Sequence, residues 1–257
     1  MISGVLLDLA GVIYDGEVAV PGATEAVLRL RDVGLPIRFV SNTTRSTKPA
    51  VLDRLARLGL SVAADEVFTP AEAARQWLSE HDRSPHLLVH PNLAPEFEDL
   101  ASDLPKAVVV GDAGEAFDYR ALNAAFRELI AGAELLALAP NRTFMDSDGK
   151  LSLDAGAFVT GLEFASQKSA IVLGKPSQAF LRSALATINC PGAQAVMVGD
   201  DAETDVAGAL QAGLAHALLV RTGKYRKGDE KRFEPAPTAT VRDISEAVDW
   251  IIEARKR

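Results

Sequence analysis

Four polar motifs follow short apolar runs, at points where strands of a parallel sheet would end. Ligands of a doubly wound sheet bind outside the carboxyl ends of its strands, so these motifs are the first candidates for a site. They contain carboxylates, hydroxyls and one lysine, which would meet if the strands are neighbours. In chain order the residues are Asp8, then Ser41, Asn42 and Thr43, then Lys175, then Asp200 and Asp201, with Asp205 in the helix that follows.

This set of side chains is suited to phosphoryl transfer. A carboxylate at Asp8 can attack phosphorus as a nucleophile, and Asp200 beside it can hold Mg²⁺, a hard cation that offsets repulsion between carboxylate and phosphate. Lys175 and the Ser41 hydroxyl would then bind the phosphoryl oxygens as charge redistributes in the transition state. The pattern predicts a reaction through an aspartyl-phosphate.

The elements that must position these motifs alternate between strand and helix. Apolar runs at 5–9 and 37–40 indicate strands, and helical spacing follows each of them. The same alternation resumes near the carboxyl end, with strands expected at 170–173, 195–198 and 216–220 and helices at 177–186, 204–211 and 244–253. Short connections between such elements are typical of right-handed βαβ units. We therefore expect an α/β fold, a Rossmann-like doubly wound parallel sheet built from residues 1–78 and 171–257.

A second α/β domain is expected between the two halves of that sheet. Residues 79–170 have an alternation of their own, with strands predicted at 87–89, 107–110 and 135–138 and helices at 119–130 and 155–165. This segment is long enough to fold as an inserted domain.

Composition excludes several classes of protein. Hydrophobic residues make up 48% of the 257 and charged residues 24%, which is typical of a soluble globular chain. A formal net charge of −8 argues against a nucleic-acid partner, because phosphate neutralisation needs a basic face. No apolar run approaches the ~20 residues of a membrane-spanning helix, and the amino terminus shows no cationic leader. The single cysteine, Cys190, has no internal disulfide partner, so we expect a cytoplasmic protein.

The order of the four motifs resembles that of the haloacid dehalogenase superfamily, and the insertion matches that superfamily's type-2 cap position. Further segments, such as Pro21-Gly22 and Thr222 to Arg226, resemble the NagD-type subfamily. Within it, the branch of the phospholysine phosphohistidine inorganic pyrophosphate phosphatases and the haloacid dehalogenase-like hydrolase domain-containing proteins is the most similar. The resemblance covers almost the whole chain and implies a Mg²⁺-dependent hydrolase acting on a small phosphorylated molecule, with a homodimer as one expected assembly.

The resemblance also implies a role for each motif residue. It makes Asp8 the nucleophile and Lys175 the group that stabilises the transferring phosphoryl group. For Asp201 two interpretations stay open, an outer position around the metal and a turn residue. The remaining roles are metal binding by Asp8, the Ala10 carbonyl and Asp200, phosphate binding by Ser41, Asn42 and Lys175, and support of the metal or of Lys175 by Asp205.

One position departs from the superfamily pattern. Superfamily phosphatases usually carry a second aspartate two residues after the nucleophile, as general acid and base, and this chain has Ala10 there. Such a group is typically worth about 10²- to 10⁴-fold in rate. We therefore expect weak activity on alkyl phosphate esters and better activity on phosphoramidates, acyl phosphates or pyrophosphate. The alternative is a catalytically impaired protein that binds a phosphorylated ligand in the same pocket. Retention of Asp8, Lys175 and Asp200 argues against it.

Overall fold

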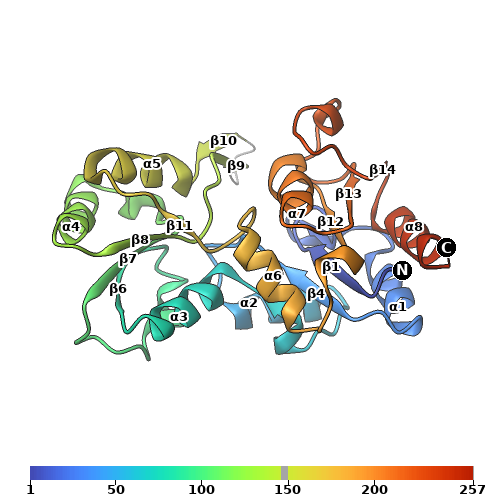
Figure 1. The fold of residues 1–257 in the computed structure, drawn as a ribbon, viewed down its shortest axis with the longest axis horizontal. Coiled ribbons are helices and arrows are strands. Elements are labelled where there is room, and N and C mark those ends of the chain that lie inside the picture. The colour runs from blue at the N-terminus through green and yellow to red at the C-terminus, as the bar shows by residue number, and fades with distance from the viewer. Residues whose placement is uncertain (146–149, 257) are drawn as a thin grey trace. The chain divides into compact units, whose positions relative to one another are not determined.

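The structure is a computed structural model that describes residues 1–145 and 150–256. The chain divides into two compact units (Figure 1). We call Met1–Ser41, Leu52–Phe68 and Lys175–Arg257 the core unit, and Asn42–Val51 and Thr69–Gly174 the inserted unit. Each unit is built around a parallel sheet of its own.

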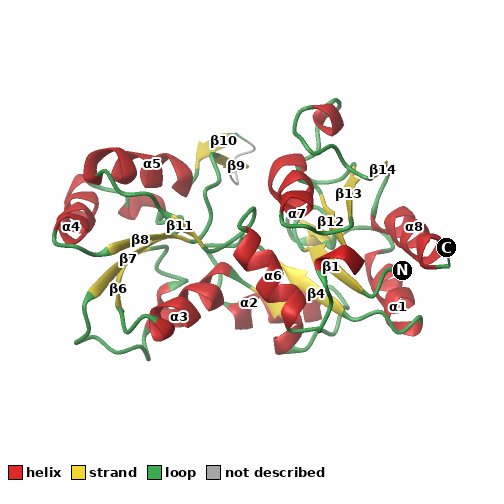
Figure 2. Ribbon diagram, in the orientation of Figure 1, coloured by secondary structure: helices red, strands yellow, loops and turns green. Residues whose placement is uncertain are grey.

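The core unit contains a parallel sheet of six strands in the order β14-β13-β12-β1-β4-β5 (Figure 2). All five residues of β1 are buried, as are those of β12, because helices cover both faces of a parallel sheet. The strand order reverses direction around β1, which has β4 on one side and β12 on the other. The strands are β1 (Gly4–Asp8), β4 (Ile37–Val40), β5 (Val67–Phe68), β12 (Ala195–Gly199), β13 (His216–Val220) and β14 (Ala239–Val241).

Helices of the core unit lie on both faces of this sheet. Helices α1 (Ala23–Asp32) and α8 (Ile244–Arg255) contact each other on one face, and α6 (Gln178–Ala186) and α7 (Gly208–Gln211) on the other (Figures 1 and 2). A π-helical stretch, Ala202–Ala207, leads into α7. Helix α2 (Lys48–Arg57) has residues in both units.

A small hairpin follows β1 in the core unit. Strands β2 (Tyr14–Asp15) and β3 (Val18–Ala19) pair antiparallel, and Gly16 between them takes the left-handed conformation that the tight turn requires. Each strand has two residues, too few for a pattern of alternating burial to show in the sequence.

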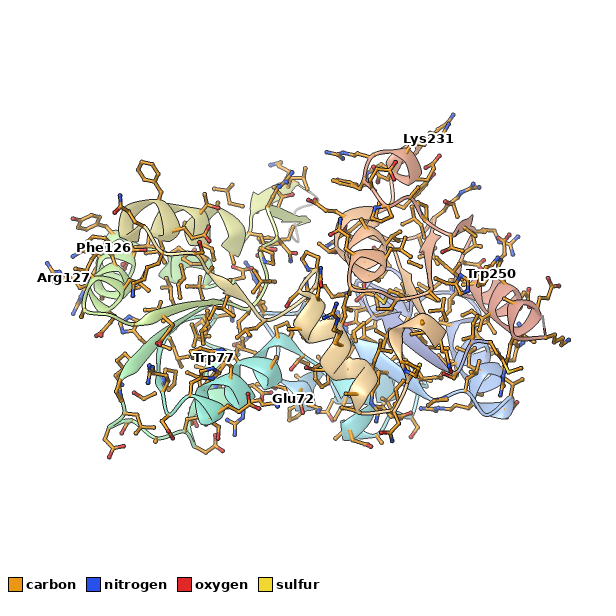
Figure 3. The ribbon with its side chains drawn as sticks, viewed as in Figure 1. Glu72, Trp77, Phe126, Arg127, Lys231 and Trp250 are labelled. Atoms are coloured by element: carbon orange, nitrogen blue, oxygen red, sulfur yellow. The ribbon has the colours of Figure 1, made fainter. Side chains whose placement is uncertain are left out.

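The inserted unit holds a four-stranded parallel sheet in the order β11-β8-β7-β6. Alternate residues of β7 face opposite sides: Ala107 and Val109 belong to a buried apolar cluster with α3 (Pro70–Glu80), and Val108 and Val110 to a cluster with α4 (Tyr119–Ile130) and α5 (Ala155–Ser166). Figure 3 labels Trp77 on α3 and Phe126 on α4, which pack against these two clusters. The remaining strands are β6 (Ser84–Leu88), β7 (Lys106–Val110), β8 (Glu134–Ala137), β11 (Ile171–Val172) and the antiparallel pair β9 (Thr143–Met145) and β10 (Leu151–Leu153).

The expected fold class is confirmed: a Rossmann-like parallel sheet with helices on both faces, and a second α/β unit inserted in it. One strand assignment was wrong. The run 170–173 was expected in the first sheet, but β11 pairs with β8 in the second, with Ile171 opposite Leu136. An apolar run of this length fits either sheet, so its sequence did not distinguish them.

The boundaries of the two units also differ from the expected domain boundaries. The inserted unit begins its second segment at Thr69, because Ala71, Ala74 and Leu78 of α3 are buried against the second sheet. The division into 1–78, 79–170 and 171–257 as functional domains stays a prediction.

Candidate functional site

Asp8 ends β1 and is 6% exposed. The register of the sheet places it opposite Val40 of β4, and places the preceding Leu7 opposite Val198 of β12. The residues that directly follow these neighbours are Ser41 and Gly199-Asp200. Because all three strands are parallel, their polar ends meet at one edge of the sheet, as the sequence predicted.

Lys175 lies between two buried carboxylates. Its Nζ is 2.6 Å from Asp8 Oδ1 and 2.7 Å from Asp205 Oδ1, and the residue is 2% exposed. Burial disfavours the ammonium charge, but attraction by Asp205 and Asp8 outweighs it and raises the pKa of Lys175 above its ordinary value. Lys175 therefore stays charged at neutral pH.

Asp205 has both carboxylate oxygens engaged. Oδ1 pairs with Lys175, and Oδ2 accepts the backbone N–H of Asp201 at 3.2 Å. Burial raises the pKa of Asp205 to about 6, against the lowering effect of Lys175. The side chain comes from the π-helical stretch after β12 and orients the lysine ammonium towards Asp8.

Two loops contact the Asp200 carboxylate. Its Oδ2 accepts the backbone N–H of Lys224 at 2.7 Å. A Cβ added to Gly11 or to Gly223 would overlap this same oxygen, and both glycines have positive φ, +77° and +60°. Only glycine permits so close an approach in this conformation. The loops are joined to each other, because the Thr222 hydroxyl donates to the Gly11 carbonyl.

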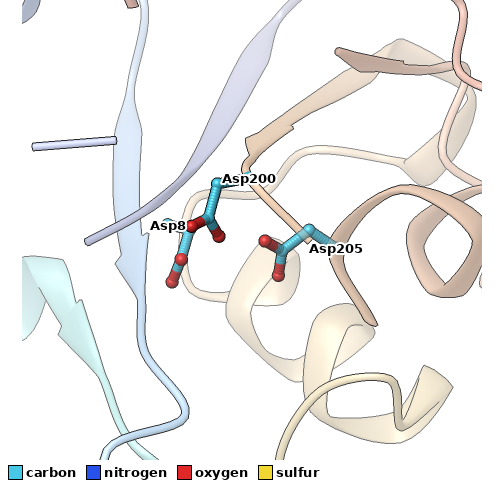
Figure 4. Close-up of side chains that lie close together, drawn as sticks. All are labelled: Asp8, Asp200 and Asp205. Atoms are coloured by element: carbon cyan, nitrogen blue, oxygen red, sulfur yellow. The ribbon is translucent and has the colours of Figure 1, made fainter. Parts of the chain in front are cut away.

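The buried carboxylates fit a divalent cation. One carboxylate oxygen from each of Asp8, Asp200 and Asp205 lies within 4.8 Å of the other two. Figure 4 shows the three side chains close together. Burial, and then repulsion by Asp8 and Asp205, raises the pKa of Asp200 well above its ordinary value, so the single charge of Lys175 does not compensate all three groups. A hard cation with oxygen ligands supplies the missing positive charge.

Asp201 acts as a turn residue. Its Oδ1 accepts the backbone N–H groups of Glu203 and Thr204, each at 3.0 Å, at the start of the π-helical stretch. Burial disfavours its charge, but attraction by Lys224 and these N–H groups lowers its pKa. These bonds account for the turn interpretation, and a position around the metal stays a prediction.

Three other residues were predicted to belong to the site, and the structure places each of them. Ser41 is buried directly after β4, and its backbone N–H donates to the Phe68 carbonyl at 3.1 Å. Ala10 is exposed and forms a backbone bridge with Tyr14. Asn42 belongs by its contacts to the inserted unit, so its phosphate-binding role stays a prediction.

Sequence reasoning about side chains missed the loop after β13. Gly223 and the Lys224 backbone N–H contact Asp200, and Thr222 fixes Gly11. A backbone donor leaves no mark in residue type, so the one signal was the resemblance of the segment Thr222 to Arg226 to the NagD-type subfamily.

Comparisons with known proteins agree with this geometry. A model of the haloacid dehalogenase-like hydrolases matches residues 5–102, and a related HAD-hydrolase-like model matches residues 172–247. Human haloacid dehalogenase-like hydrolase domain-containing protein 2 is 43% identical over 252 residues, which cover 98% of this chain and 96% of that protein. The chain belongs to the haloacid dehalogenase-like hydrolase family.

Two further relatives place this hydrolase within its family. The phospholysine phosphohistidine inorganic pyrophosphate phosphatase of Danio rerio is 43% identical over 261 residues, covering 99% of this chain and 96% of that protein. The structure of NagD from E. coli is 26% identical with a TM-score of 0.82, covering 95% of this chain and 98% of that one. The NagD-like resemblance and the expected enzyme class, a hydrolase, are confirmed, and these relatives support phosphohydrolase activity. Among the described residues, no helix is both long and apolar enough to span a membrane.

Proposed function

We propose that this haloacid dehalogenase-like hydrolase is a Mg²⁺-dependent phosphatase with Asp8 as its nucleophile. The observation that carries the proposal is the buried cluster at the end of β1, where Lys175 Nζ lies 2.6 Å from Asp8 Oδ1 and Asp200 stands alongside. A carboxylate nucleophile, a fixed ammonium and a second carboxylate able to hold a metal form the set that phosphoryl transfer through an aspartyl-phosphate needs.

The proposed reaction has two steps. First, the Asp8 carboxylate attacks phosphorus, and the bond from phosphorus to the leaving group breaks, so that the group departs with the bonding electrons. Second, a water molecule attacks the phosphorus of the aspartyl-phosphate, which releases inorganic phosphate and restores Asp8. Lys175, held in place by Asp205, stabilises the phosphoryl oxygens in both steps, and the buried Ser41 hydroxyl binds them.

The metal site is assigned to the carboxylates of Asp8 and Asp200 and the Ala10 carbonyl. Bound Mg²⁺ supplies positive charge that offsets repulsion between the carboxylates and the substrate phosphate. Asp205 is assigned a supporting role, because its two oxygens already engage Lys175 and the Asp201 N–H.

The substrate class follows from position 10. The Ala10 methyl has no proton to give, so a leaving group that departs as a strong base is disfavoured. We therefore propose small phosphoramidates, acyl phosphates or pyrophosphate as substrates, in agreement with the name of the Danio rerio relative. A cytoplasmic location and a homodimer stay predictions.

A substrate panel tests this proposal. Phosphate release is measured from acetyl phosphate, pyrophosphate, phospholysine and glycerol phosphate, with Mg²⁺ and with a chelator, in the parent and in Asp8→Asn. We expect Mg²⁺-dependent release from the first three that the variant lacks. Tight binding of the same compounds without release would instead support the impaired phospho-ligand binding protein.

A further inference from the structure

Arg54 of the core unit has no part in the proposed mechanism, and its surroundings are unusual. Arg54 lies on α2, and its side chain is 27% exposed. Its Nη2 pairs with the carboxylate of Glu17, which is 78% exposed, and its Cζ lies 4.6 Å from the centroid of the Tyr14 ring. Its Nε is buried and has no hydrogen-bond partner. An unpaired buried donor is unfavourable, whereas a cation over the face of an aromatic ring is favourable.

Tyr14 connects this contact to the backbone of the nucleophile loop. The ring is buried, with the residue 6% exposed, and the Tyr14 carbonyl accepts the Gly11 N–H at 2.7 Å. The Tyr14 N–H donates to the Leu9 carbonyl at 3.2 Å, and a bridge joins Tyr14 to Ala10. The backbone of Tyr14 is therefore bonded to the chain from Leu9 to Gly11.

The hairpin that contains Tyr14 needs an anchor. Strands β2 and β3 have two residues each, and an isolated two-stranded hairpin is at best marginally stable in water. Val18 is largely exposed, so the tip of the hairpin adds little apolar burial. Arg54 contacts the hairpin at two points, at the Tyr14 ring in β2 and at the carboxylate of Glu17 in the turn.

We propose that Arg54 is a positioning residue that fixes the Ala10–Gly11 backbone beside Asp200 by clamping the Tyr14 ring. Gly11 lies against Asp200 Oδ2, and its carbonyl accepts the Thr222 hydroxyl. A displaced Gly11 therefore disturbs its own contact with Asp200 and also the loop of Thr222, which contacts Asp200 through Gly223. The consequence for metal binding rests on the proposed function, in which Ala10 and Asp200 are ligands. The consequence for the loop itself does not.

The test compares Arg54→Lys with two matched variants. Lysine keeps the charge opposite Glu17 but lacks the planar guanidinium that stacks on a ring. Glu17→Gln removes the exposed ion pair and keeps the ring contact. Arg29→Lys alters another exposed ion pair of the core unit, the one with Asp249 of α8. Near-ultraviolet circular dichroism checks that each variant folds.

Three readouts are taken. Amide hydrogen exchange at Gly11 and Tyr14 is measured in metal-free protein, Mg²⁺ binding is measured by calorimetry, and kcat and KM are measured for acetyl phosphate. For Arg54→Lys we expect exchange at Gly11 to quicken and Mg²⁺ to bind more weakly, each by roughly 3- to 30-fold, the range for a partly desolvated cation–π contact. A fall in kcat with KM nearly unchanged is expected to accompany them. Glu17→Gln and Arg29→Lys should stay within about twofold of the parent.

Parental exchange at Gly11 in Arg54→Lys would overturn the inference. So would an equal effect of Glu17→Gln, because the ion pair and not the ring would then hold the hairpin. Hydrogen exchange needs neither metal nor substrate. If no substrate is hydrolysed, the proposed function fails while the exchange result still decides the role of Arg54.

Discussion

Replacing Lys175 by methionine tests the electrostatic account of the site. Methionine keeps an unbranched apolar side chain and removes the ammonium that lies 2.6 Å from Asp8 and 2.7 Å from Asp205. Both carboxylates are buried and would lose their cation. Removing one partner of a buried ion pair typically destabilises a protein by about 3–5 kcal/mol. We predict a loss of this size in the free energy of unfolding of the metal-free protein at pH 7.5.

The loss should shrink at lower pH. The pKa of Asp205 is raised to about 6 in the folded parent, above the roughly 3.9 of an unfolded chain. When the pKa of a group is higher in the folded protein than in the unfolded chain, protonation of that group stabilises the fold. This stabilisation is complete below the pKa of the unfolded chain and is lost as the pH rises through the pKa of the folded protein. Without Lys175 the pKa of Asp205 rises further. At pH 5 the Asp205 carboxyl group is then protonated in the variant, so one of the two charges that lost their cation is removed.

Urea denaturation with a chelator present, at pH 5 and pH 7.5, measures both effects. Lys168→Met is the matched control, because Lys168 Nζ donates to the Ala133 carbonyl at 2.6 Å and not to a carboxylate. The control should lose less stability and show no comparable dependence on pH. A loss below about 1 kcal/mol for Lys175→Met at pH 7.5, against the expected 3–5, would refute the reasoning. A loss that is equal at the two pH values would refute it too.

Three further substitutions test separate parts of the site. Asp8→Asn should abolish phosphate release while the circular dichroism spectrum stays parental, and turnover near the parent rate would exclude Asp8 as nucleophile. Ala10→Asp should raise kcat/KM for glycerol phosphate by about 10²- to 10⁴-fold and that for acetyl phosphate much less, and equal gains would show that proton transfer at position 10 is not limiting. Gly223→Ala should weaken Mg²⁺ binding, because the added Cβ overlaps Asp200 Oδ2. Gly34→Ala is its control, since Gly34 has φ +70° but open space around it, and a similar Mg²⁺ affinity in the two variants would contradict the proposed cradle.

The part of the site that consists of charged side chains at strand ends could be predicted from the sequence. Asp8 and Asp200 lie at the ends of neighbouring strands, and the sheet register brings them together as expected. Lys175 also reaches Asp8, although the strand before it belongs to the other sheet.

Backbone contacts and very short strands could not be predicted from the sequence. The Lys224 N–H that binds Asp200 would be the same for any residue but proline, so residue type gave no signal. The two-residue strand β5 is too short for a period of two to be recognised. The clamp of Arg54 on Tyr14 joins residues far apart in the sequence, and neither residue carries a local pattern that indicates it.

Chemical trapping of the proposed intermediate tests the central claim most directly. The enzyme is mixed with acetyl phosphate and Mg²⁺, quenched in acid and treated with borohydride, which reduces an acyl phosphate to an alcohol. Tandem mass spectrometry then locates the modified residue. The account predicts homoserine in place of Asp8 in the parent and none in Asp8→Asn. Homoserine at another aspartate, or an unmodified Asp8 in enzyme quenched during rapid turnover, would contradict it.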